Sequence, residues 1–209
     1  GWALPGQIID LLDRNEQAPV PLLAGFNSDE LRTQGILVPA APDTPEAYEQ
    51  LIRCGYGEYA DAYLAIYPPD DPEQATFDAF RDTVYGWAGE HLVRSQTDIG
   101  APAYLYMFDH CYPAAEALGI CGFHASELPF VFGQTGEDAA LTANWPAPVD
   151  DTDETLSAAM IDYWASFAAT GQPVSEAGPD WLPYAQDQSY MRFDGVPHLE
   201  QDPVPGMYE

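Results

Sequence analysis

Glu30 and His124 each follow a run of apolar residues that is typical of a buried strand. Glu30 comes after residues 19–26 (PVPLLAGF) and a polar turn, and His124 lies in the loop after residues 104–108 (YLYMF). Open α/β sheets place catalytic groups outside the carboxyl ends of their parallel strands. A carboxylate there could orient an imidazole, which would then serve as the general base for a nucleophile. The alternative from spacing alone is a solvated Glu30 and an ordinary loop histidine.

The elements that must position these two residues alternate along the chain as strand, helices, strand, loop, helix and strand. This alternation predicts an α/β fold. Residues 44–67 have the pattern of two helices, with Thr44 as a cap and a break at Cys54–Gly55. Residues 72 to about 95 predict a longer helix with one apolar stripe formed by Phe77, Phe80, Val84, Trp87 and Leu92.

Near the end of the chain, residues 153–169 predict a second amphipathic helix, with Gly171 as its stop. Residues 189–193 (SYMRF) predict a short edge strand. Two or three strands are fewer than a doubly wound sheet normally has, so the pattern indicates part of a sheet.

The charge of the chain is strongly one-sided. Its 209 residues carry 34 Asp and Glu against 6 basic residues, all arginine, for a formal net charge of −28. This charge argues against nucleic acid and anionic membrane surfaces as partners. Solvation in a salty environment and attraction of a cationic substrate both fit, and the scatter of the acids favours the first. No apolar run is long enough for a membrane span, and residues 1–5 lack signal-peptide features.

The three cysteines, Cys54, Cys111 and Cys121, have neither CxxC nor zinc-ligand spacing. Cys111 and Cys121 bracket a short segment with a proline and a glycine, which suits a disulfide-closed loop; two unpaired thiols are the alternative. A secreted or periplasmic location is slightly favoured over a cytoplasmic one. His124 and Glu127 could share a helix face, but no third ligand has fitting spacing, so no metal site is expected.

Two longer segments carry a family resemblance. Residues 20–30 (VPLLAGFNSDE) and 122–133 (GFHASELPFVFG) resemble the segments that hold the triad glutamate and histidine of type-B carboxylesterases and cholinesterases. Further segments follow in the order of that family: residues 1–5, 62–68, 103–108, 163–173 and 181–184. The resemblance implies that residues 1–209 are the C-terminal half of one α/β-hydrolase catalytic domain, with a mostly parallel sheet, flanking helices and a helical insertion.

By this resemblance Glu30 is the triad acid, His124 is the triad base, and Glu127 matches a glutamate that helps to hold the active site. Asp29 is the neighbouring rival for the acid. The implied activity is hydrolysis of a small-molecule carboxylic ester by a Ser-Glu-His triad without a metal or organic cofactor. No G-x-S-x-G elbow and no glycine-rich oxyanion loop occur in residues 1–209. In the family both lie in the N-terminal half, which is therefore the expected partner, from the same precursor or as a separate chain.

The sequence also departs from the family pattern. Leu31 stands where a glycine commonly follows the triad glutamate, and Thr33, Gln34 and Leu37 replace the aromatic cluster of cholinesterases, so choline esters are not implied. Thr33, Leu37 and Phe123 are the candidates for lining a substrate pocket. The alternative function is a non-catalytic esterase-like module for binding or adhesion, as in neuroligin-type relatives. That branch often loses triad residues, so the presence of both Glu30 and His124 favours the enzyme.

Overall fold

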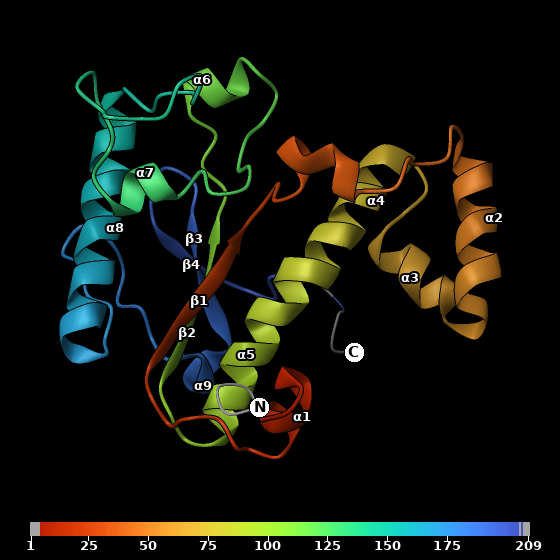
Figure 1. Ribbon diagram of the computed structural model, residues 1–209, viewed down its shortest axis with the longest axis horizontal. Helices are drawn as coiled ribbons and strands as arrows, with labels where there is room; N and C mark the ends of the chain where they lie inside the picture. Colours follow the sequence, from red (N-terminus) through yellow and green to blue (C-terminus); the bar gives the residue numbers. More distant parts are fainter. Residues whose placement is uncertain (1–4, 205, 207–209) are drawn as a thin grey trace.

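The computed structural model describes residues 5–204 and 206, and its centre is a four-stranded sheet in the order β1-β2-β3-β4 (Figure 1). The strands are β1 (Leu22–Asn27), β2 (Ala103–Phe108), β3 (Ser189–Phe193) and β4 (His198–Gln201). The β1–β2 and β2–β3 pairs are parallel, and β4 is antiparallel to β3. The predicted α/β fold with a mostly parallel sheet is therefore confirmed.

The register of β1 against β2 brings the ends of these strands to the same level. Pairing runs from Leu22 opposite Ala103 to Asn27 opposite Phe108. One more ladder bond follows, in which the backbone N–H of Ser28 donates to the carbonyl of Phe108. The turn that carries Glu30 and the loop that leads to His124 consequently leave the sheet at the same edge.

The predicted edge position of residues 189–193 was wrong. β3 lies between β2 and β4, and the turn at Asp194 and Gly195 returns the chain as β4. An interior place suits this strand because Tyr190, Met191 and Phe193 are all buried. Its side chains enter two hydrophobic clusters, since Met191 and Phe193 belong to one and Tyr190 to the other.

Helices cover both faces of the sheet, with α8 (Asp151–Thr170) on one side and α5 (Trp87–Asp98) on the other (Figure 1). Alternate residues of β2 point to opposite faces. Tyr104 and Phe108 pack in the cluster with Leu156, Met160 and Tyr163 of α8, whereas Leu105 packs in the cluster with Val93 of α5. Both faces of β2 are therefore covered by helices and buried, which explains its unbroken apolar sequence.

The remaining helical elements are shorter or lie at the periphery. They are α1 (Ile8–Asp13), η1 (Arg32–Leu37), α2 (Pro45–Tyr56), η2 (Gly57–Tyr59), α3 (Ala60–Ile66), α4 (Pro72–Arg81), η3 (Asp82–Gly86), α6 (Pro113–Glu116), α7 (Leu128–Val131) and α9 (Tyr184–Asp187). Helices α2 to α4 pack around their own small core, which includes Tyr48, Ile52 and Ala75. Within the described part of the chain, no helix is long and apolar enough to cross a membrane.

Several helix boundaries differ from the predicted ones. The first of the two helices predicted over residues 44–67 ends before Gly57, whose φ is +56°, rather than at Cys54–Gly55. The helix predicted from residue 72 is interrupted by the π-helical turn η3 and then continues to Asp98. Helix α8 begins two residues earlier than predicted because Asp150 and Asp153 form a capping box. It ends as predicted before Gly171, which has a left-handed conformation with φ +79°.

Candidate active site

The acid of the candidate site is held in a tight turn at the end of β1. Glu30 is 5% exposed, and its Oε1 accepts a hydrogen bond of 3.0 Å from the backbone N–H of Asn27. The backbone N–H of Asp29 donates to the carbonyl of Gly122, which ties this turn to the segment before His124. The acid turn and the histidine loop are therefore joined through the backbone as well as through side chains.

The imidazole of His124 meets the second oxygen of Glu30. The distance between His124 Nδ1 and Glu30 Oε2 is 2.5 Å, so the ring nitrogen and the carboxylate share a short hydrogen bond. The side chain of His124 is 41% exposed, in contrast to that of Glu30 at 7%. Within residues 5–204, no hydrogen bond engages Nε2 of this histidine. Glu30 thus orients the imidazole through Nδ1, and Nε2 is left for another group.

Burial shapes the electrostatics of this pair. Removal from water raises the pKa of Glu30, and the nearby carboxylate of Glu127 acts in the same direction. The hydrogen bonds from His124 and from the backbone N–H of Asn27 oppose this rise without cancelling it. The ring of Tyr85, on the π-helical turn η3, lies 5.9 Å from the imidazole between ring centroids. The dyad therefore sits in an environment that is partly screened from solvent.

The other predicted site residues have different surroundings. Glu127 lies with its Oε2 2.6 Å from Nδ2 of Asn27. Asp29, the rival acid, pairs with Arg32 at 3.2 Å. Thr33 and Leu37 are exposed on η1, and Leu37 is 61% exposed. Phe123 is buried in the core, with its ring centroid 5.2 Å from that of Trp145.

The structure thus brings Glu30, His124 and Glu127 together and leaves Thr33 and Leu37 on an exposed helix. Sequence reasoning missed Asn27, which is 1% exposed. It donates hydrogen bonds to Glu30, to the carbonyl of Phe123 and to Glu127. The available signal was a polar residue at the end of an apolar strand, directly before the acid turn. Among the described residues, no group of three or more metal-ligating side chains could hold a metal ion.

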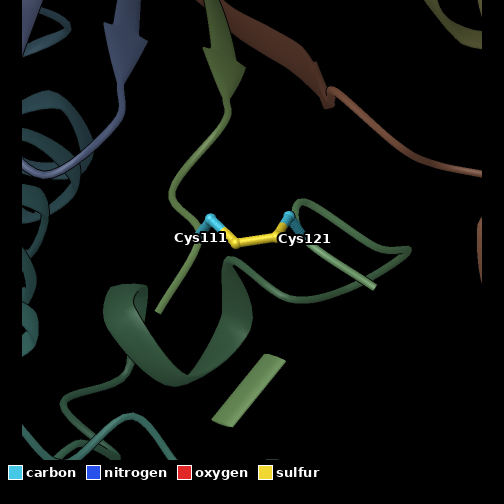
Figure 2. The surroundings of a disulfide bond; sticks show 2 residues. All are labelled: Cys111 and Cys121. Atoms are coloured by element: carbon cyan, nitrogen blue, oxygen red, sulfur yellow. A yellow bond between two sulfur atoms is a disulfide. The ribbon is translucent and has the colours of Figure 1, made fainter. Parts of the chain in front are cut away.

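A disulfide between Cys111 and Cys121 closes the loop between β2 and His124 (Figure 2). Gly122 follows it directly, with φ +55°, and a Cβ at this position would lie 2.1 Å from Oγ of Ser28. The positive φ and this contact therefore favour glycine where the histidine loop crosses the acid turn. The disulfide and the glycine together limit where the backbone of Phe123 and His124 can go.

Replacing both cysteines of this disulfide with serine is expected to lower the free energy of unfolding by about 3 kcal/mol, because the open loop adds chain entropy to the unfolded state. Activity should also fall, since the loop leads directly into His124. Denaturant titration of the complete protein measures the first effect and ester turnover the second. Cys54→Ser is the matched control, because Cys54 is an exposed free thiol. Equal midpoints for the double variant and the control would contradict the expectation.

Comparison with solved structures assigns the class of the fold. A pNB esterase structure matches with a TM-score of 0.71 and 25% identity, over 96% of this chain and 40% of that one. The crystal structure of Aspergillus niger EstA matches with a TM-score of 0.72 and 17% identity, over 97% of this chain and 41% of that one. The sheet and its helices are thus part of an esterase α/β-hydrolase fold.

Sequence comparison gives the family. Residues 3–204 match the carboxylesterase family, and the chain belongs to that family. Carboxylesterase 5A of Canis lupus familiaris is 29% identical, over 93% of this chain and 36% of the relative. Acylcarnitine hydrolase of Rattus norvegicus is 28% identical, over 96% of this chain and 38% of the relative. The resemblance inferred from the sequence is confirmed, and the chain spans well under half the length of these relatives.

Proposed function

We propose that this chain is the C-terminal half of a carboxylic ester hydrolase with a Ser-Glu-His triad. Glu30 is the acid and His124 is the base, while the N-terminal half of the same catalytic domain supplies the serine and the oxyanion-hole donors. The observation that carries the proposal is the 2.5 Å contact between Glu30 Oε2 and His124 Nδ1, which leaves Nε2 for the serine. Membership of the carboxylesterase family supports the same reaction class.

In the proposed reaction, Nε2 of His124 takes the proton of the serine hydroxyl as the serine oxygen attacks the ester carbonyl carbon. The imidazolium that forms donates from Nδ1 to Glu30, whose carboxylate stabilises the positive charge. The imidazolium then returns its proton to the leaving alcohol as the C–O bond breaks. A water molecule repeats the sequence on the acyl-enzyme, and it releases the carboxylic acid and the free serine.

The burial of Glu30 has a role in this scheme. A carboxylate in a water-poor site interacts with the imidazolium more strongly than a solvated carboxylate does. The backbone N–H of Asn27 fixes Oε1, so Oε2 is held toward the imidazole. The dyad is thereby oriented before an ester binds, and little reorganisation is needed when charge develops on His124.

The test is covalent labelling of the complete protein with a fluorophosphonate, followed by intact mass measurement and peptide mapping. Pepsin is used so that this chain is covered as well, because it lacks lysine and trypsin would leave residues 95–192 uncut. One adduct is expected on a serine in a G-x-S-x-G peptide outside this chain, and His124→Ala should abolish it. A complete protein that does not label would instead support a non-catalytic binding module, and the roles of Glu30 and His124 would be withdrawn.

A further inference from the structure

Asn27 contacts both carboxylates at the candidate site. It is the last residue of β1 and is 1% exposed. Its backbone N–H donates to Glu30 Oε1 at 3.0 Å, and its side-chain Nδ2 donates to Glu127 Oε2 at 2.6 Å. The same Nδ2 also donates to the carbonyl of Phe123 at 2.9 Å. One buried residue therefore joins the acid turn, the histidine loop and the second glutamate.

The side-chain amide of Asn27 has as many N–H donors as there are acceptors around it. A primary amide has two N–H groups, and both are used here, on a carbonyl and on a carboxylate. The carbonyl it holds belongs to Phe123, the residue directly before His124. The bond to Phe123 therefore fixes the backbone from which the imidazole projects, while the bond to Glu127 fixes the orientation of a second carboxylate.

The two carboxylates interact electrostatically. Glu127 is close enough to Glu30 to raise the pKa of Glu30, so its negative charge is felt at the dyad. Two carboxylates that share one imidazole would leave the position and tautomer of the ring unsettled. In the structure Glu30 binds the imidazole and Glu127 binds Asn27.

We propose that Asn27 is a positioning residue of the esterase, and that it assigns Glu30 to the imidazole by holding Glu127 and the backbone of Phe123. The inference rests on the proposed function and adds to it the residue that selects the acid. Asn27 itself does not touch the reacting atoms. The ionisable groups that act on Glu30 are His124 and Glu127 from the histidine segment, while Tyr85 from η3 and Tyr106 from β2 feel its charge.

The test is a set of three variants made in the complete protein: Asn27→Asp, Asn27→Ala, and a double variant that combines Asn27→Asp with Glu127→Gln. Asn27→Asp keeps the shape but replaces the amide donors with a third carboxylate. We expect kcat to fall by about tenfold or more with KM within about threefold. The acid-side midpoint of kcat should rise by about one pH unit, because a like charge disfavours ionised Glu30.

The double variant and the alanine variant distinguish a positioning role of Asn27 from a general loss of structure at the site. In the double variant the new amide at position 127 can donate to the new carboxylate at position 27, and one negative charge is removed. Its kcat should therefore recover by about fivefold or more and its acid midpoint should return. Asn27→Ala adds no charge, and it should lower kcat by about tenfold with the acid midpoint little changed. Asn15→Asp is the matched control, since Asn15 is exposed.

All rates are normalised to the fraction of sites that react with the fluorophosphonate, so loss of folded protein does not count as loss of kcat. A wild-type protein that labels, together with variants whose kcat and acid midpoint equal those of Asn15→Asp, would overturn the role of Asn27 and leave the esterase proposal standing. Failure of the double variant to recover would also overturn it, because a purely structural contact gives no charge-specific rescue. A wild-type protein that does not label would remove both proposals.

Discussion

Replacing His124 with alanine is expected to lower kcat/KM for a chromogenic ester by about 10⁶-fold in the complete protein. The reason is that the imidazole both accepts the serine proton and returns it to the leaving alcohol, so its loss removes two proton transfers at once. KM should change little, because the imidazole does not bind the remote parts of the ester. Steady-state kinetics with an active-site titration measures both parameters.

His198→Ala is the matched control for this experiment. Its side chain is also 41% exposed, but it lies on β4 against Asp194 and Glu200, outside the candidate site. Its kcat/KM should stay within about twofold of the wild-type value, as for a surface change away from the site. If His124→Ala kept more than about a tenth of wild-type activity, His124 would not be the general base.

Replacing Glu30 with glutamine is expected to lower kcat by about 10⁴-fold. Glutamine preserves the shape and can still accept from the backbone N–H of Asn27. Its amide N–H would, however, donate to Nδ1 of His124, which places the imidazole proton on Nε2 and leaves no acceptor for the serine proton. The imidazolium would also lose its negative partner. Glu16→Gln is the control, because Glu16 is an exposed glutamate that pairs with Arg14.

The same variant should separate stability from activity. The pKa of Glu30 is raised in the folded protein, mainly by burial, so the folded state holds this proton more tightly than the unfolded state does. The stability that protonated Glu30 contributes is present at low pH and is lost as pH rises through the raised pKa. The glutamine of the variant does not titrate. Thermal unfolding midpoints of the variant, relative to wild type, should therefore increase as pH rises through this window, and a constant difference would contradict the raised pKa.

Much of the fold was predictable because local signals and tertiary packing agree. The apolar runs before Asn27 and Asp109 form strands β1 and β2, and helix α8 has both a cap and a glycine stop in its sequence. Both strands are parallel, so their ends meet at one edge, and this brought Glu30 and His124 within reach of each other. Spacing alone left the pairing of Glu30 with His124 open, and the family resemblance of residues 20–30 and 122–133 assigned it.

The remaining parts depend on contacts that have no local signal. Strand β4 is four residues long with one apolar residue, and it forms only because β3 is there to pair with it. The predicted apolar stripe between residues 77 and 92 fails at Val84, Trp87 and Leu92, which are exposed. The π-helical turn at Asp82–Gly86 changes the helical period inside this stripe and so rotates the following residues away from the predicted face.

The contact between Glu30 and His124 joins residues that are ninety-four positions apart, and the parallel pairing of β1 with β2 has a similar span. Such contacts must close a long segment of chain before they return any favourable energy, and folds that are dominated by them form slowly. No short fragment around Glu30 or His124 could hold the dyad, because Glu30 follows strand β1 and His124 follows strand β2. The dyad therefore forms only in molecules in which these long-range contacts between the two segments have already closed.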